Sequence, residues 1–319
     1  MSFAVSSNAD SVGDVRSRIE ERVLGREREL KLVLAAVASG RDLLLEGPPG
    51  TSKSTLLRAI TAEWGGIPLV FVEGNADLTP TRLVGHHNPA RVLAEDYSAG
   101  NFVEGPLLEA MRTGGFLYIE EFNRAPDDTL NTLLTAMAER VITVPPRVGS
   151  VTALPTFRVV ASMNPYDNVG TTRLSTSVHD RMCRLVTTYQ DSAAEREIVS
   201  RRTGVVSARL LADAVALTRM TRERADIQQG SSVRGAIDLA VIAEQLCALD
   251  QVVVPAVEAV APPRGLPETY TAVILDAMLL ALSGRIHLDD ATFNIPPEAV
   301  LREIWQDYFL LLPAAADPG

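Results

Sequence analysis

The sequence has few cysteines, few lysines and no long apolar run. Its two cysteines, Cys183 and Cys247, lie far apart and outside any ligand-spaced set, which excludes a disulfide framework or a cysteine-rich zinc site. We expect both in the core, where a free cysteine packs as a small apolar side chain. Charge interrupts every apolar run well before the roughly 18 residues of a membrane helix. Because the start, "MSFAVSSNADSVGD", also lacks signal-peptide features, we expect a cytoplasmic protein without a membrane span.

Positive charge is scarce as well. The formal net charge is -10 at pH 7, which argues against a protein that binds nucleic acid or membranes mainly through charge. Lysine is rarer still, because Lys31 and Lys53 are the only two and every other basic side chain except the histidines is arginine. The 319 residues, 46% of them apolar, are enough for one large globular domain or two ordinary ones.

Short apolar runs alternate with helical patterns in the first half of the chain. A helix is expected over residues 26–39, where apolar side chains recur every three or four positions. Near-continuous apolar strands that alternate with helices predict an α/β core with a parallel sheet covered by helices. The runs expected as strands are residues 43–46, 67–73, 115–122 and 156–164.

Beyond Tyr189 the pattern becomes helical, with three-and-four spacing over residues 192–202, 207–224, 232–249 and 268–285. We therefore predict a flexible N-terminus, an α/β core and a second, α-helical domain. The core carries an insertion between its second and third strands and a hairpin after its third strand. The expected bounds are 1–20 for the N-terminus, 21–188 for the core, 78–104 for the insertion, 141–154 for the hairpin and 189–319 for the helical domain.

Residues 47–54, "GPPGTSKS", have the pattern of a phosphate-binding loop between a strand and a helix. In such a loop backbone N–H groups surround the phosphates, Lys53 reaches the β- and γ-phosphates, and the Ser54 hydroxyl is a magnesium ligand. The alternative is an ordinary Gly/Pro turn with a solvated lysine. Ser52 stands where the pattern has glycine, and it is tolerated if it keeps a negative φ. The predicted nucleotide-binding residues are Gly47, Pro48, Pro49, Gly50, Thr51, Ser52, Lys53, Ser54 and Thr55.

The stretch "FLYIEEFNRAP" ends an apolar strand in two adjacent carboxylates. In phosphoryl transfer one acid at a strand end holds Mg²⁺, and a second positions or deprotonates the attacking water. We assign Glu120 to magnesium and Glu121 to water. The usual magnesium acid is aspartate, so Glu120 is one methylene longer than the pattern.

These motifs resemble those of the MoxR group of AAA+ ATPases. The shared features are "GPPG..KS", an acidic strand end followed by "NRAP", "L..AM.ER.ITVP", "MNP" and a "DR" pair, and they span roughly residues 20–245. Among subgroups the chain is most similar to the ATPases associated with carbon monoxide dehydrogenase maturation. The resemblance implies a P-loop AAA+ core followed by an α-helical lid, with ATP and Mg²⁺ as cofactors.

The resemblance also implies roles for three further residues. Asn164, in "ASMNP", matches sensor 1, which holds the attacking water, although an Asn-Pro turn is the plain alternative. Arg181, in "VHDRM", matches the arginine finger that reaches a neighbouring subunit, with Met182 where the family has phenylalanine. Arg234, in "GSSVRGAIDLA", matches sensor 2, which closes on the phosphates of its own chain. Surface salt bridges are the alternative for both arginines.

Three further features of the sequence remain. His86 and His87 invite a metal interpretation, but no second cluster is spaced to join them, so a loop role is favoured. The segment "RVLGRE" (22–27) matches the family's adenine-pocket segment. The family also places the insertion and the hairpin near the pore of a ring.

The leading hypothesis is an ATP hydrolase that forms a homo-oligomeric, hexameric ring and remodels or matures another protein. Family relatives commonly act with a von Willebrand factor A domain protein to activate a client metalloenzyme. A nucleic-acid-dependent AAA+ motor is the alternative, although the expected hairpin offers only Arg147 as a basic contact. A small-molecule kinase with the same loop is a third possibility, and it would need an acceptor site in its lid.

Overall fold

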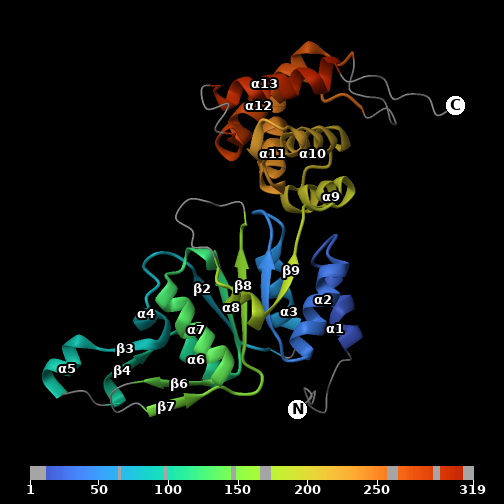
Figure 1. The fold of residues 1–319 in the computed structure, drawn as a ribbon. Helices are drawn as coiled ribbons and strands as arrows, with labels where there is room; N and C mark the ends of the chain where they lie inside the picture. Colours follow the sequence, from blue (N-terminus) through green and yellow to red (C-terminus); the bar gives the residue numbers. More distant parts are fainter. Residues whose placement is uncertain are drawn as a thin grey trace. The chain divides into compact units, whose positions relative to one another are not determined.

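A computed structural model describes residues 12–63, 66–95, 99–144, 149–165, 174–256, 265–289 and 295–311. The chain forms two compact units, Met1–Thr188 and Tyr189–Gly319, and each is described by itself. The first unit is an α/β structure and the second is helical (Figure 1).

The first unit is built around a five-stranded parallel sheet with the strand order β2-β5-β8-β1-β9. This confirms the α/β class and the four strands expected from the apolar runs. The sheet strands are β1 (Asp42–Glu46), β2 (Leu69–Glu73), β5 (Phe116–Glu120), β8 (Arg158–Met163) and β9 (Met182–Val186). The helices of this unit are α1 (Val12–Glu20), α2 (Glu27–Ala38), α3 (Lys53–Glu63), α4 (Pro80–Val84), α5 (Pro89–Glu95), α6 (Pro106–Thr113), α7 (Asp127–Glu139) and α8 (Thr176–Arg181).

Both faces of this sheet are buried, because successive side chains of a strand point to opposite faces. In β1, Leu44 packs into a core with α6 and α7, whereas Leu43 and Leu45 pack into a second core with α1, α2 and α3. Figure 1 shows these two groups of helices on either side of the strands. Continuous apolar runs such as "DLLLE" therefore mark strands that are covered on both faces.

Two expectations about this unit need correction. The flexible N-terminus expected over residues 1–20 is wrong for residues 12–20, which form helix α1, while residues 1–11 lie outside the described part. Helix α1 is held because Val15 and Ile19, four residues apart, are buried on one face, and because Arg18 pairs with Glu63 of α3. Strand β9 was not expected either, since only Met182 and Leu185 of its five residues are buried at the sheet edge.

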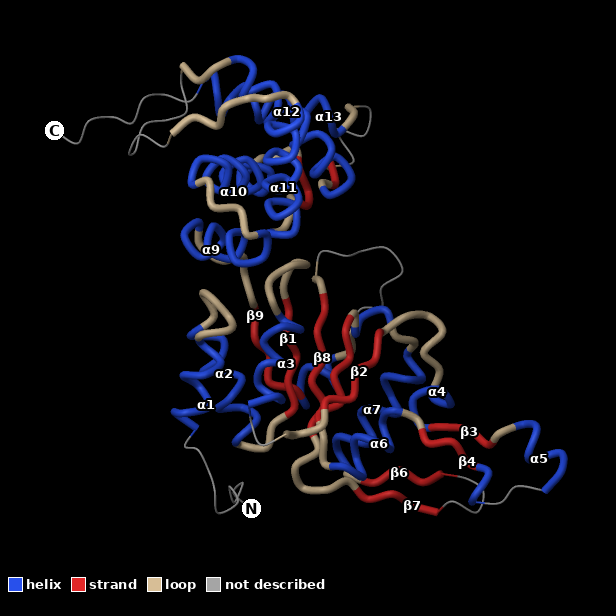
Figure 2. Tube along the Cα trace, turned by 180° about the vertical axis from the view of Figure 1, so that it is seen from behind, coloured by secondary structure: helices blue, strands red, loops and turns tan. Residues whose placement is uncertain are grey.

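The insertion and the expected hairpin form two small antiparallel ribbons. Strand β3 (Gly85–His87) pairs with β4 (Phe102–Glu104), and β6 (Val141–Val144) pairs with β7 (Gly149–Thr152). Figure 2 shows both ribbons beyond the five-stranded sheet, with α5 beyond β3 and β4. Strands β3, β4 and β6 line one groove of about 950 Å³, together with side chains of α4 and α7. Residues 96–98 and 145–148, the latter including Arg147, lie outside the described residues.

His86 and His87 belong to strand β3, not to a loop as favoured from the sequence. The ring of His87 packs edge-on against Phe102 of β4, with 5.2 Å between the ring centroids. Within the described residues, no group of three or more His, Cys, Asp and Glu side chains could hold a metal ion. His87 therefore serves as a packing residue of the ribbon.

The second unit confirms the four helices expected from three-and-four spacing. Its apolar faces form one core that is separate from the two cores of the first unit. A two-stranded antiparallel pair and a last helix, followed by a π-helical turn over Asp307–Leu311, were not expected. None of the described helices is both long and apolar enough to span a membrane. The elements are α9 (Ser192–Thr203), α10 (Ala208–Glu223), β10 (Ile227–Gln229), α11 (Val233–Leu249), α12 (Glu268–Leu282), β11 (His287–Leu288) and α13 (Pro297–Gln306).

Candidate functional site

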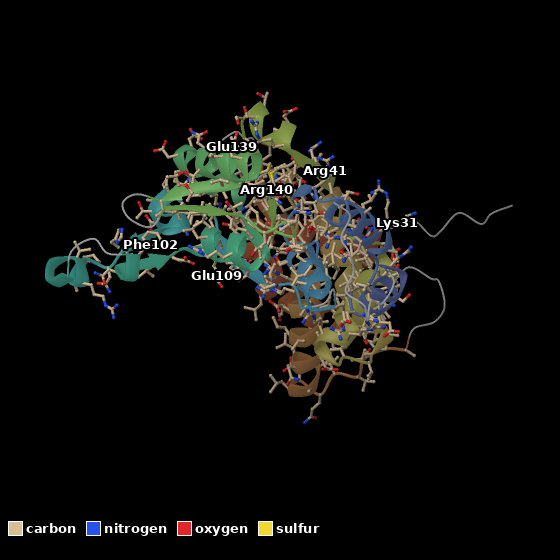
Figure 3. The ribbon with its side chains drawn as sticks, turned by 90° about the horizontal axis from the view of Figure 1, so that it is seen from below. Lys31, Arg41, Phe102, Glu109, Glu139 and Arg140 are labelled. Carbon is tan, nitrogen blue, oxygen red and sulfur yellow. The ribbon has the colours of Figure 1, made fainter. Side chains whose placement is uncertain are left out.

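The loop 47–52 connects the end of β1 to the first turn of α3, as a phosphate-binding loop does. Lys53 opens this helix, and its Nζ donates to the carbonyl oxygens of Gly47 and Pro48 at 2.8 and 2.9 Å. The ammonium therefore lies over the loop instead of extending into solvent. The other lysine, Lys31, is exposed on α2 (Figure 3), so only Lys53 lies at the strand ends.

Ser52 has a φ of +65°, so the negative φ at which serine would replace glycine without strain is not kept. The left-handed region suits glycine, and a serine there carries a cost of order 1 kcal/mol or more. Gly50 has a similar φ of +75°. The two left-handed residues turn the chain back so that successive N–H groups can face one point, and the loop keeps this path although serine replaces the glycine.

The start of the loop is fixed from the neighbouring strand β9. The Thr187 amide donates to the carbonyl oxygen of Glu46 at 2.7 Å, and the Thr187 and Thr51 hydroxyls lie 3.2 Å apart. A Cβ on Gly47 would lie 2.3 Å from the Thr187 carbonyl oxygen, so only glycine fits. Thr187 follows an edge strand and no sequence motif marks it, which explains why it was missed.

Glu120 ends strand β5 and meets the phosphate loop through Ser54. The Ser54 hydroxyl donates to Glu120 Oε1 at 2.5 Å, and the Tyr118 hydroxyl donates to the same oxygen at 3.3 Å. Burial raises the pKa of Tyr118 to about 12. Sequence reasoning missed Tyr118, although its position two residues before Glu120 places both side chains on one face of the strand.

Two side chains of this cluster offer oxygen atoms that suit magnesium, which prefers hard oxygen ligands. The hydroxyl of Ser54 and the carboxylate of Glu120 converge from different elements to hydrogen-bond distance. The donor set therefore fits Mg²⁺, and the assignment of both residues to the metal stays a prediction.

Glu121 follows the strand with a left-handed backbone, at a φ of +53°. The carbonyl groups of this turn press against β2, because a Cβ on Gly74 would lie 2.4 Å from the Glu121 carbonyl oxygen. The Glu121 side chain is about 41% exposed and forms an ion pair of 3.0 Å with Arg124. A strained backbone thus turns one acid inward, toward Ser54, and leaves the next one at the surface.

Asn164 follows β8, the strand between β1 and β5. Its carbonyl oxygen accepts from the side-chain amide of Asn123 at 3.4 Å, and Asn123 is buried just after the two acids. Because all five strands are parallel, their carboxyl ends meet at one edge. The structure therefore brings Lys53, Ser54, Glu120, Glu121 and Asn164 to the same edge of the sheet.

The two predicted arginines belong to helices α8 and α11. Arg181 ends α8 in an exposed position, and its Nη1 donates to the carbonyl oxygen of Ser177 at 3.1 Å. Arg234 belongs to the second unit, where Ser232 caps α11 and Arg234 is exposed in the first turn. Neither side chain forms a surface salt bridge among the described residues, and their sensor and finger roles stay predictions.

Two further expectations can be compared with the structure. Cys183, expected in the core, is exposed because it lies on the edge strand β9, whereas Cys247 is buried as expected. In the segment 22–27, Arg26 is buried and its Nη2 donates to the carbonyl oxygen of Thr188 at 2.6 Å. This segment is therefore joined to the end of the first unit.

A phosphate loop after strand β1, acids after β5 and the strand order β2-β5-β8-β1-β9 define the P-loop AAA+ fold. The family model described as AAA domain (dynein-related subfamily) matches residues 42–182. A mutant of RuvB from Thermotoga maritima has a similar fold, with a TM-score of 0.51 and 15% identity, covering 83% of this chain and 73% of that protein.

Sequence relatives make the assignment more specific. A gas vesicle ATPase, GvpN, from Ancylobacter aquaticus is 28% identical over 227 residues, which cover 66% of this chain and 62% of that protein. Protein MoxR from Paracoccus denitrificans is 31% identical over 185 residues, which cover 58% of this chain and 52% of that protein. The chain spans less than two thirds of the length of both of these relatives. The matched part of the chain is thus similar to AAA+ ATPases of the MoxR type.

Proposed function

We propose that the chain binds ATP with Mg²⁺ at the strand ends of the first unit and hydrolyses the γ-phosphate bond. The observation that carries this proposal is the 2.5 Å contact between Ser54, at the start of α3, and Glu120, at the end of β5. It supports a single site made from the phosphate loop and the acidic strand end.

Each residue of the edge has a distinct task in this proposal. The loop N–H groups and Lys53 bind the phosphates, and Lys53 exchanges its loop carbonyl partners for phosphate oxygens. Ser54 and Glu120 hold Mg²⁺, which supplies positive charge to the phosphate oxygens when it is bound. Glu121 takes a proton from the attacking water, and Asn164 orients that water.

Two variants test these assignments. Lys53→Ala is expected to lose affinity for ATP, whereas Glu121→Gln is expected to bind ATP and to hydrolyse it about 10²- to 10⁴-fold more slowly. The measurements are equilibrium binding of a fluorescent ATP analogue and steady-state phosphate release. Glu109→Gln, on the exposed face of α6 (Figure 3), is the matched control. Normal hydrolysis by Glu121→Gln would reject the role given to that carboxylate.

We further propose that the chain forms a homo-oligomeric ring of six subunits. In this hexamer Arg181 completes the site of the neighbouring subunit. The exposed position of Arg181 at the end of α8 supports a contact in trans. An arginine supplied in this way is worth about 10³- to 10⁵-fold in rate. Turnover per subunit is therefore expected to fall on dilution.

Mixing two inactive variants gives a direct test of the ring. Arg181→Ala retains the phosphate site and Lys53→Ala retains the arginine, so a mixed ring contains complete sites. We expect the mixture to regain part of the wild-type rate, while each variant alone stays inactive. Arg201→Ala, which removes an exposed ion pair with Glu197, is the control. No recovery on mixing, together with normal turnover by Arg181→Ala, would contradict the ring mechanism.

For the biological task we propose that ATP turnover remodels or matures a partner protein. The motif resemblance supports two protein partners, a von Willebrand factor A domain protein and a client metalloenzyme. The similarity to the ATPases associated with carbon monoxide dehydrogenase maturation supports an enzyme of that kind as the client. The Glu121→Gln ring, arrested with ATP, is the reagent for capturing these proteins. Purified captured protein is then expected to raise the ATPase rate of the wild type. Stimulation by DNA or RNA with a steep salt dependence would favour a nucleic-acid motor instead.

A further inference from the structure

One arginine of the second unit, Arg222, connects three separate segments. Its Nη1 donates to Glu195 Oε1 and its Nε donates to the carbonyl oxygen of Ser231, both at 2.6 Å. The guanidinium carbon lies 3.8 Å from the centroid of the Tyr189 ring. The side chain is only 10% exposed, so these contacts are largely shielded from water.

The first of these segments leads directly to the phosphate loop. Tyr189 is separated from Thr187 by a single residue, and the Thr187 hydroxyl lies 3.2 Å from the hydroxyl of Thr51 in that loop. The residue between them, Thr188, accepts a hydrogen bond from the buried Arg26. The chain from the loop contact to the Tyr189 ring is therefore short and held at several points.

The second segment leads to the helix that carries Arg234. Ser231 is 1% exposed, and its amide donates to the Thr221 hydroxyl at 2.9 Å. The next residue, Ser232, caps α11. A Cβ on Gly235 would lie 2.1 Å from the Ser231 hydroxyl oxygen, so the first turn of α11 packs tightly on Ser231. A displacement of Ser231 therefore moves the turn that contains Arg234.

The third contact fixes the guanidinium itself. Glu195, in α9, is fully buried, and its second oxygen accepts from Arg219 at 3.2 Å. The planar guanidinium can pair with this carboxylate, donate through Nε and lie over an aromatic ring at the same time. A lysine ammonium lacks this geometry, so the position requires arginine.

We propose that Arg222 is a positioning residue for hydrolysis, which joins the linker residue Tyr189 to the start of α11 and so makes Arg234 respond to the phosphate loop. The inference rests on the proposed ATPase function. It assigns a role to a side chain that matches no motif of the sequence.

The test uses Arg222→Lys, which keeps a positive charge beside Glu195 and removes the Nε contact and the ring stacking. We expect kcat to fall about 10- to 100-fold, because small misplacements of a remote group have effects of this size. The Kd for ADP and the melting temperature are expected to change little. Arg201→Ala, which removes an exposed ion pair with Glu197 on the same helix as Glu195, is the control. Tyr189→Phe keeps the ring and is expected to keep the rate.

A double-mutant cycle separates this role from a merely structural one. If Arg222 acts through Arg234, then Arg222→Lys causes no further loss of kcat in an Arg234→Ala background. Losses that multiply would overturn the inference, and so would an unchanged kcat for Arg222→Lys in the wild-type background.

Hydrogen exchange provides a readout that does not need hydrolysis. Binding of a slowly hydrolysed ATP analogue is expected to protect the amides of residues 231–235 in the wild type but not in Arg222→Lys. A wild type that shows this protection but no phosphate release contradicts the ATPase proposal and leaves the coupling intact. A wild type without any change at 231–235 overturns the coupling itself.

Discussion

Glu120 and Asp213 are carboxylates with very different surroundings in the two units. Glu120, at the end of β5, is half-buried and accepts hydrogen bonds from the hydroxyls of Ser54 and Tyr118. Asp213, on α10, is fully buried, and burial raises its pKa above the ordinary value. The donors to Asp213 are Arg209 at 2.8 Å, Tyr270 at 2.7 Å and Tyr308 at 2.8 Å.

The difference separates a carboxylate available for a ligand from one used for stability. Hydroxyl partners are neutral and can be exchanged for a cation, so Glu120 keeps its capacity to bind Mg²⁺. The donors of Asp213 come from α10, α12 and the π-helical turn, and they include a guanidinium. Asp213 therefore ties the end of the described chain to the helical core, and a ligand would have to displace all of these donors.

The largest expected effect comes from Asp213→Ala. The change leaves Arg209, Tyr270 and Tyr308 without their shared acceptor in a buried site, so the unfolding free energy of the second unit is expected to fall by about 3–5 kcal/mol. Denaturant unfolding followed by tyrosine and tryptophan fluorescence measures it. ATP binding by the first unit is expected to persist. A variant that unfolds like the wild type would remove the contrast with Glu120.

Glu120→Gln is expected to lower the ATPase activity and to leave the stability unchanged, the opposite of Asp213→Ala. The amide oxygen can still accept from Ser54 and Tyr118, so the melting temperature should change little. The loss of negative charge weakens magnesium binding, so kcat/KM at low Mg²⁺ is expected to fall about 100-fold, or about 2.7 kcal/mol at 1.36 kcal/mol per tenfold change. A magnesium titration of the ATPase rate measures this effect, and added Mg²⁺ should restore part of it. An unchanged titration would exclude Glu120 as the magnesium acid.

Tyr118→Phe sharpens the comparison through pH. The ordinary pKa of tyrosine is 10.0, and burial raises that of Tyr118 to about 12. The stabilisation is therefore complete below pH 10, where both states keep the proton, and it is lost as the pH rises through 12. The rise of this pKa from 10.0 to about 12 corresponds to at most about 2.7 kcal/mol of unfolding free energy. Denaturant unfolding measures the free energy of unfolding, which is expected to fall less steeply between pH 9 and 12 for Tyr118→Phe than for the wild type. An equal fall in both proteins would contradict a raised pKa for Tyr118.

The smallest effect concerns the two thiols, one in each unit. Cys183 is exposed on β9, whereas Cys247 is buried in α11, where burial raises the pKa of its thiol. A thiol reagent is expected to modify one cysteine rapidly in the native protein and the second only after unfolding. Cys183→Ser should abolish the rapid phase without a change in stability. Two rapid phases in the wild type would show that the second unit opens more easily than its core indicates.

Much of the first unit could be predicted because its signals are local. The run before Gly47 and the turn residues around Lys53 define a strand, a loop and a helix within a few residues. Strand β9 and helix α1 were missed for the opposite reason, because their signals are not local. The burial of Met182 and Ile19 depends on neighbours distant in the sequence, such as β1 and α3, and their own patterns are short.

The sequence by itself determined the class of fold, the phosphate loop and the order in which the acids, Asn164 and Arg181 follow it. Tertiary structure alone decided which of these groups meet, because the strand order places β8 between β1 and β5 and brings Ser54 to Glu120. It also decided the three contacts of Arg222. The physical reason is that these depend on close approach between segments far apart in the chain, which residue spacing does not encode.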